Sequence, residues 1–330
     1  MNSAVAGVHM LVFALRLLVC VAATTGTSSW QASALDETRP SCAGLEPGPA
    51  RTVTRIIDGE TAALDDGTEL RLIGALAPRA IDAGTEPGTW PAEIAAKEEL
   101  RALLLGKSVE LAFGGERNDR YGRLLAQAHV REGDNRRWVQ GHLLEQGLAR
   151  AYILAGNRAC ADALLAAERG AREARRGLWA DAAYQVRPTG KPADLSRYRS
   201  TFQVVEGRVV GVAQVRGMVY LNFDADWRRA FSVSLRRGDR ALLGPNAGDP
   251  NALENKLVRV RGWIEQRHNP TNAPSIELST AGLIEVLDEP SSGAAATRPT
   301  PGGPGADRQV PDQPRRETET KPPGLVETGR

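Results

Sequence analysis

The chain has 330 residues, and 42 lysines and arginines stand against 40 aspartates and glutamates, so its formal net charge is +2. This balance excludes functions that need a strongly one-sided charge, such as a histone-like or acidic-tail role. Hydrophobic residues at 42% and charged residues at 25% exclude a mostly disordered protein, and the length predicts about two domains. The four histidines and three cysteines are too scattered for a zinc finger or an iron–sulfur cluster, so any metal must bind to carboxylates.

The N-terminus has the pattern of a secretory signal peptide. An apolar segment at residues 10–23, interrupted by Arg16, is followed by small and polar residues and by an A-S-A cleavage motif at residues 32–34. The apolar segment is shorter than the roughly 20 residues that a membrane-spanning helix needs. We therefore expect residues 1–34 to be removed, no transmembrane segment, and a periplasmic or secreted protein. The alternative is a lipoprotein anchored through Cys20, although the residue before this cysteine is bulky.

Cleavage at this motif leaves two cysteines, Cys42 and Cys160. Two thiols in an oxidising compartment favour one disulfide, and a bond that closes a loop of about a hundred residues contributes about 4–5 kcal/mol in the chain-entropy description. The alternative is two unrelated thiols.

A first domain is predicted over residues 35–183. Residues 51–74 alternate apolar and polar side chains around D-G turn signals, which predicts a three-stranded meander. The pattern then predicts a helix at 91–105, strands at 108–113 and 124–130, a helix at 139–146 and a last helix at 160–178. Five strands and three helices in this order predict an α+β domain. His129 and His142 have no evident partners, and we expect them at the surface or at a barrel edge.

A second domain is predicted over residues 201–288, after a linker at 184–200 that is rich in proline, glycine and charge. Strands are expected at 202–215, 218–224, 230–235, 257–266 and 275–287, with a weak helical stretch at 251–255. Five strands with a short helix after the third predict a barrel of the OB type. Residues 289–330, dominated by proline, glycine, threonine and charge, are expected to be a disordered tail.

Aromatic and cationic residues are mixed in the second domain. They are Trp227, Phe231, Arg228, Arg229, Arg236 and Arg237. This mixture is typical of a platform for single-stranded nucleic acid. The alternative is an ordinary twisted sheet with Trp227 in its core.

Four sequence blocks of the first domain stand in a recognisable order. They are I-D-G-E-T at 57–61, L-R-L-I-G-A-L-A-P at 70–78, D-R-Y-G-R at 119–123 and R-R-G-L-W at 175–179. Together they resemble the staphylococcal nuclease (thermonuclease) family. The resemblance implies an α+β, mainly β protein, namely a staphylococcal nuclease-like OB barrel with three helices. The second domain is similar to the OB-like extension of some bacterial members.

The resemblance also implies a site. In that family two aspartates and a backbone carbonyl hold a calcium ion, a glutamate is the general base toward water, and two arginines neutralise the scissile phosphate. The arginines correspond to Arg71 and Arg123, whose planar guanidinium groups can each bond two phosphate oxygens. The first metal-binding acid corresponds to Glu60, but the second falls on Leu76 and the general base on Arg79. Calcium prefers six to eight oxygen ligands, so Ca²⁺ is a doubtful cofactor here.

Several alternatives remain open at this site. In the loop after residue 78, Asp82 or Glu86 could replace a missing acid. Tyr121 corresponds to a tyrosine near the phosphate and Tyr152 to one that packs on the substrate base, but each could be a partly buried barrel tyrosine. Arg71 and Arg123 could form an internal ion pair with Glu60. Two arginines and one glutamate nevertheless predict a net positive pocket, which favours an anion.

The resemblance therefore implies an exported thermonuclease-like protein. As an enzyme it would hydrolyse phosphodiesters of DNA or RNA with an incomplete calcium and general-base site, with a nucleic acid or nucleotide as its partner. The alternative is a catalytically inactive nuclease-fold binding or scaffold protein of the cell envelope.

Overall fold

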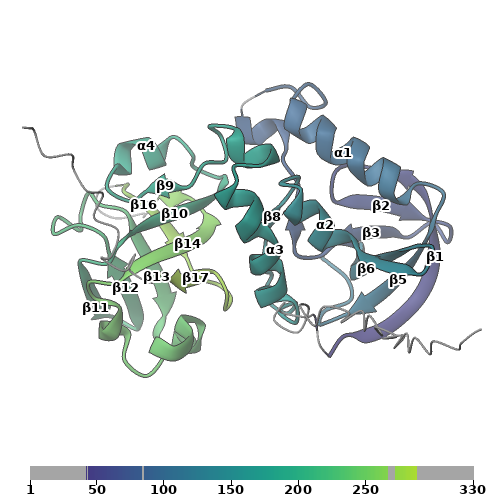
Figure 1. The fold of residues 1–330 in the computed structure, drawn as a ribbon. Coiled ribbons are helices and arrows are strands. Elements are labelled where there is room, and N and C mark those ends of the chain that lie inside the picture. The colour runs from purple at the N-terminus through teal and green to yellow at the C-terminus, as the bar shows by residue number, and fades with distance from the viewer. Residues whose placement is uncertain (1–41, 43, 84, 267–271, 288–330) are drawn as a thin grey trace, which may run out of the picture. The chain divides into compact units, whose positions relative to one another are not determined.

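The computed structural model describes residues 42, 44–83, 85–266 and 272–287 (Figure 1). The predicted signal peptide, residues 1–34, and the predicted tail, residues 289–330, lie outside these residues. In the described part of the chain, no helix has the length and apolar character needed to cross a membrane.

Five strands of the first half of the chain close into a barrel. The elements in order are β1 (Glu46–Ile56), β2 (Thr61–Leu64), β3 (Glu69–Leu72), β4 (Ala75–Leu76), η1 (Ala80–Ala83), α1 (Pro91–Leu104), β5 (Ser108–Phe113), β6 (Leu124–Glu132), β7 (Asn135–Trp138), α2 (Val139–Glu145), β8 (Arg150–Ala151), α3 (Ala161–Glu173) and η2 (Gly177–Ala180). The strand order is β3-β2-β1-β5-β6, and a parallel pairing of β3 with β6 closes the ring. Leu70 and Leu72 of β3 and Ala126 and Ala128 of β6 are fully buried, as alternating residues that face a barrel interior should be. The predicted five-stranded barrel with three helices is confirmed.

The last predicted helix, residues 160–178, is shorter than expected. It ends at Glu173, because Arg175 adopts a left-handed backbone with φ of 49°. The chain then turns, and a Cβ on Gly177 would lie 2.2 Å from the carbonyl oxygen of Gly147. The apolar spacing continues across this break because Leu178, in the following 3₁₀ turn, is also buried. Strand β7, which pairs with β6, was not predicted from the residue pattern.

The second half of the chain contains two further sheets, which together form one closed ring of strands. The elements are β9 (Arg187–Pro188), α4 (Pro192–Ser196), β10 (Phe202–Arg208), β11 (Gly211–Val215), β12 (Met218–Asn222), β13 (Ser232–Arg236), η3 (Arg237–Asn246), η4 (Pro250–Leu253), β14 (Leu257–Trp263), β15 (Glu265–Gln266), β16 (Pro274–Glu277) and β17 (Ile284–Val286). The sheets have the orders β17-β14-β10-β9 and β11-β12-β13-β16-β15. The chain passes directly from β10 to β11 and from β14 to β15, and β13 pairs with β16 in parallel. Counted along the chain, β13 is the third strand of the ring and β16 the fifth. Their parallel pairing corresponds to that of β3 with β6 in the first barrel.

Two details of this second barrel differ from simple expectations. The stretch predicted as a linker, residues 184–200, contains β9, which pairs with β10, and the short helix α4. Trp227 is 43% exposed, so the alternative that placed it in the core is wrong. The guanidinium of Arg228 lies 4.7 Å from the centre of its ring.

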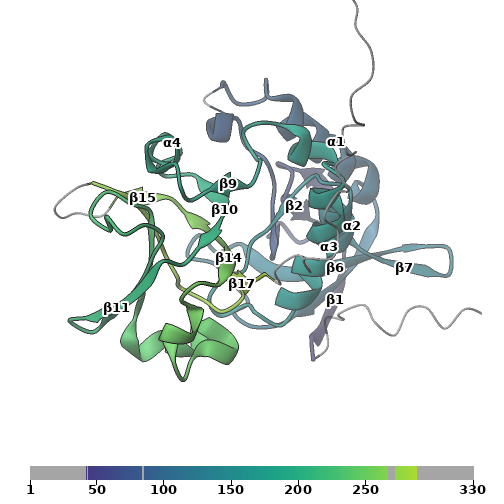
Figure 2. The same cartoon turned by 60° about the vertical axis from the view of Figure 1, so that its left-hand side comes forward.

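A buried cluster of charges joins α3 to β14, which lie beside each other in Figures 1 and 2. Glu168 of α3 and Arg261 of β14 are almost completely buried, and an Nη1–Oε2 hydrogen bond of 3.0 Å joins them. Arg172 donates to the same carboxylate at 2.7 Å, and Arg261 also donates to Glu285 at 3.0 Å. Burial opposes ionisation, yet the two arginines hold the pKa of Glu168 below its ordinary value. Two guanidinium groups and two carboxylates thus neutralise one another, with Glu168 and Arg261 out of contact with water and Glu285 partly exposed.

We expect Glu168→Ala to lower the free energy of unfolding by about 3–5 kcal/mol, because it leaves Arg261 and Arg172 buried without their shared carboxylate. Urea denaturation followed by circular dichroism measures the change. The matched control is Glu173→Ala, at the exposed end of the same helix, which should change stability by no more than about 0.5 kcal/mol. Equal, small effects of the two substitutions would contradict the role of the cluster.

His129, expected at the surface or a barrel edge, is buried on the outer side of β6. Its Nδ1 has no hydrogen-bond partner within the described residues. Burial, with the nearby charge of Arg136, lowers the pKa of His129 from 6.5 to about 4. The unfolded chain therefore takes up this proton at higher pH than the folded protein does. The stability that neutral His129 contributes above pH 6.5 is lost as the pH falls through this window.

We expect His129→Gln to lose less unfolding free energy than the wild type when the pH is lowered from about 7 to about 4.5. Denaturation curves of both proteins at the two pH values give the comparison. An identical pH dependence of the two proteins would show that His129 titrates normally.

Candidate functional site

Glu60 lies in the turn between β1 and β2, and both of its carboxylate oxygens are engaged. Oε1 lies 3.2 Å from Nη2 of Arg71, and Oε2 accepts a 2.8 Å hydrogen bond from the backbone N–H of Ala77. Thr61 pairs with Arg71 across β2 and β3, which explains why Glu60 and Arg71 meet. Burial raises the pKa of Glu60, although the charge of Arg71 and the Ala77 hydrogen bond oppose this shift. The structure therefore contains the internal ion pair between Arg71 and Glu60 that the sequence analysis left open as an alternative.

Arg123 pairs with a carboxylate that the sequence analysis did not assign to it. Its Nε donates to Oδ2 of Asp119 at 2.8 Å, and Nη2 lies 2.7 Å from the same oxygen. The other oxygen of Asp119 accepts from the backbone N–H groups of Tyr121 and Arg123. Partial burial would raise the pKa of Asp119, but the hydrogen bonds from Arg123 hold it below its ordinary value. Tyr121 is 68% exposed, so it is not a partly buried barrel tyrosine.

Arg71 and Arg123 face the same side of the barrel wall. Arg71 is opposite Leu125 in the parallel β3–β6 register, and Arg123 comes two residues before Leu125. Each guanidinium already has its own carboxylate, Glu60 for Arg71 and Asp119 for Arg123. These four side chains carry no net charge when ionised, whereas the sequence analysis counted one carboxylate and expected a positive pocket.

The two positions that the resemblance assigns to missing acids, Leu76 and Arg79, make structural contacts. Leu76 is buried in β4, opposite Arg150 of β8. Arg79 pairs with Asp82 at 3.2 Å, and its guanidinium lies 5.4 Å from the ring centre of Trp263 in the second barrel. Neither position offers an oxygen to a metal or a base to a water molecule.

Asp82, a candidate to replace a missing acid, belongs to a buried network instead. Its side chain is 2% exposed and accepts hydrogen bonds from Arg150 at 3.1 Å and from the hydroxyl of Tyr184 at 3.2 Å. Burial and the charge of Asp82 raise the pKa of Tyr184, which keeps this hydroxyl protonated. Arg150 also donates to the carbonyl oxygen of Phe202 in β10. Glu86, the other candidate, is exposed on the loop.

Tyr152 packs on aromatic residues of the second barrel. Its ring meets that of Phe202 edge to face at 5.2 Å and that of Trp263 at 6.5 Å. The sequence placed Tyr152 near a substrate base, but its closest aromatic neighbours in the described chain are these two rings. They were not predicted, because they are at least 50 residues away along the sequence.

The residues at this site do not fit a calcium ion. Glu60 is a single carboxylate, with one oxygen paired with Arg71 and the other accepting from the backbone N–H of Ala77, and calcium needs six to eight oxygen ligands. The side chains of Leu76 and Arg79 add no oxygen. Across the residues that the structure describes, no group of three or more histidine, cysteine, aspartate or glutamate side chains could hold a metal.

Cys42 and Cys160 are joined by a disulfide that spans 118 residues and ties the start of β1 to the N-terminus of α3. Cys160 is buried beside the barrel core.

Comparison with known proteins identifies the first barrel. Residues 69–181 match the family model described as staphylococcal nuclease homologue. The chain therefore contains a staphylococcal nuclease homologue domain over these residues, which include Arg71, Leu76, Arg79 and Arg123. This family acts on nucleic acids and usually uses Ca²⁺. The family match does not extend to the second barrel, and no curated protein matches the chain.

We expect Asp82→Ala to lower the free energy of unfolding by about 3 kcal/mol or more, because Arg150 would remain buried without its carboxylate. The matched control is Glu86→Ala on the exposed part of the same loop, with a change of no more than about 0.5 kcal/mol. Thermal and urea denaturation of the two variants give the comparison. If Asp82→Ala were as stable as the control, the buried network would not be what holds this loop.

Proposed function

We propose that this protein is an exported binding and scaffold protein with a nuclease fold, and that it does not hydrolyse phosphodiesters by the calcium mechanism of its family. The observation that carries the proposal is the state of Glu60. Its two oxygens already contact Arg71 and the backbone N–H of Ala77, so a metal would compete with both contacts, and the side chains of Leu76 and Arg79 would add no further oxygen ligand.

The proton chemistry supports the same conclusion. Hydrolysis of a phosphodiester needs a group that accepts a proton from water, and a guanidinium stays protonated at any physiological pH. Arg79 stands at the family's general-base position, where it pairs with Asp82 and lies over Trp263. This position thus contributes to the contact between the two barrels.

Binding of nucleic acid through the first barrel is expected to be weak. A phosphate that approaches Arg71 or Arg123 competes with Glu60 or Asp119, each of which already pairs with its guanidinium at 3.2 Å or less. Exposed electrostatic binding that competes with such pairs weakens further as salt screens it.

Two features support export to an oxidising compartment. The first is the signal-peptide pattern at residues 1–34, and the second is the disulfide between Cys42 and Cys160, since such bonds persist outside the reducing cytosol. The proposed location is the periplasm or the cell exterior.

A second candidate function is slow hydrolysis of nucleic-acid phosphodiesters. One observation favours it, namely that Arg71 and Arg123 share one side of the barrel wall, as a pair of phosphate-binding arginines should.

A nuclease assay on the full chain separates the two functions. We expect single-stranded DNA and RNA to be cleaved no faster with Ca²⁺ than with a chelator, while an active nuclease of the family, run in parallel, responds to the metal. Calcium-stimulated cleavage that is lost in both Glu60→Gln and Arg71→Ala would overturn the proposal and establish the second candidate. Asp134→Asn, in the exposed β6–β7 turn, is the matched control for loss of a carboxylate.

A further inference from the structure

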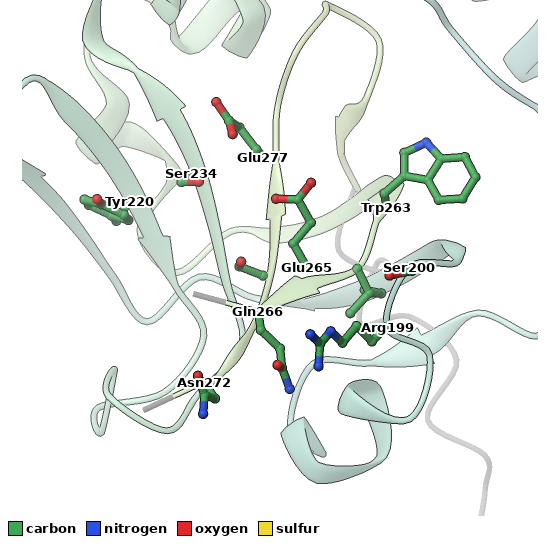
Figure 3. A pocket seen from close by; sticks show the side chains of 11 residues that line it. Arg199, Ser200, Tyr220, Ser234, Trp263, Glu265, Gln266, Asn272 and Glu277 are labelled. Carbon is green, nitrogen blue, oxygen red and sulfur yellow. The ribbon is translucent and has the colours of Figure 1, made fainter. Parts of the chain in front are cut away.

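A pocket of about 860 Å³ lies on the outer face of the second barrel (Figure 3). Strands β12, β13, β15 and β16 form its floor, and the segment just before β10 borders it. Its volume is within the usual range of small-molecule sites, about 300–1,000 Å³. The side chains that matter for its chemistry are Arg199, Tyr220, Ser234, Glu265 and Glu277.

The strand register explains why these polar groups gather. Tyr220 pairs with Ser234, and Ser234 pairs with Glu277, so the three form a row across β12, β13 and β16. Glu265 is opposite Ser275 on the antiparallel neighbour β15, which makes it a diagonal neighbour of Glu277, at a typical separation of about 7–8 Å. Residues that alternate with this row, such as Val219, Val233 and Ile276, are fully buried on the opposite face. The row therefore faces outward, into the pocket.

Within the described part of the chain, the carboxylates of Glu265 and Glu277 and the hydroxyls of Tyr220 and Ser234 make no side-chain hydrogen bond or ion pair. The contrast with the neighbouring sheet is clear, because Glu285 there pairs with Arg261.

The charges of the described lining residues disfavour a polyanion as the natural ligand. Among these residues two carboxylates, Glu265 and Glu277, face one guanidinium, Arg199, so their ionised side chains carry a net negative charge. A phosphodiester would be repelled by the two free carboxylates, each of which is an acceptor only. The same carboxylates are strong acceptors for hydroxyl groups, and Tyr220 of the same face offers an apolar ring surface.

Hydroxyl donors, apolar ring faces and the absence of negative charge are together the properties of a sugar chain. We propose that the second barrel binds an oligosaccharide without acidic groups, with Glu265 and Glu277 accepting its hydroxyl hydrogens and Tyr220 lying against its rings. OB barrels present such a face to oligosaccharides as well as to oligonucleotides, and the carboxylates select the first class. This inference goes beyond the proposed function of the first barrel and holds whether or not that barrel cleaves nucleic acid.

Isothermal titration of the full chain tests the inference. The probes are neutral tetrasaccharides of glucose, of xylose and of N-acetylglucosamine, the deacetylated glucosamine tetramer, and single-stranded oligo-dT. We expect at least one saccharide to bind with a Kd below about 1 mM and oligo-dT neither to bind at this pocket nor to compete. Tighter binding of the deacetylated tetramer would identify an amine-bearing sugar, and equal binding a neutral one.

Two conservative variants connect binding to the pocket. Glu277→Gln keeps the size of the side chain but removes the charged acceptor, and Tyr220→Phe keeps the ring but removes the hydroxyl. We expect Glu277→Gln to weaken saccharide binding by about tenfold at an unchanged melting temperature, and Tyr220→Phe to weaken it by no more than about threefold, because the ring that lies against the sugar is kept. Asp239→Asn, exposed at the start of η3 in the same barrel, should bind as the wild type does. Absence of binding by every saccharide, binding that ignores both variants, or oligo-dT binding that depends on Glu277 would each overturn the inference.

Discussion

The buried ion pair between Glu168 and Arg261 is the contact on which the arrangement of this chain depends. Two charges out of water are tolerated only when they meet with good geometry, so α3 and β14 must keep the spacing that joins them. Glu168 also accepts a 2.6 Å hydrogen bond from the backbone N–H of Ala151, which ties β8 to the same point. Because β8 pairs with β4, the loop after β4 is placed by this ion pair as well.

The placement of that loop accounts for the state of the nuclease site. Of the two positions that the resemblance assigns to family acids, Arg79 lies against Trp263 of the second half of the chain, and Leu76 is opposite Arg150, which donates to Phe202 of that half. A carboxylate at position 76 would be buried in β4, and one at position 79 would lie beside Asp82, so each would meet burial or like charge. Loss of the family's acids and contact with the second barrel are thus two aspects of the same packing.

Alternation and turn signals were enough to predict the strands of both halves, because strands with one buried face carry their pattern locally, whereas the first barrel was predicted from the family resemblance. Charge partners were harder to predict, as Arg261 illustrates. In β14, Val258 and Val260 are buried, so the strand period of two places Arg259 and Arg261 on the outer face. From the sequence alone, side chains on that face are expected to be exposed to solvent. Helix α3 covers that face with Glu168, which is 93 residues away along the chain. The Asp119–Arg123 pair was closer in sequence, but it depends on a tight turn whose geometry the residue types alone did not fix.

Pairing of charges, more than their number, determines what each barrel can attract. The chain has 42 cationic and 40 anionic side chains, and this near balance says little about a ligand. At the first barrel, Arg71 and Arg123 are each compensated by a carboxylate within 3.2 Å, which reduces the field that a phosphate would feel. At the second barrel, Glu265 and Glu277 are without a partner in the described chain, so their acceptor capacity is available to a ligand. The first barrel, whose fold the family uses for polyanions, is thereby combined with a second-barrel surface suited to hydroxyl donors. A charge that is paired within the protein contributes to folding, whereas an unpaired charge remains available to recognise a ligand.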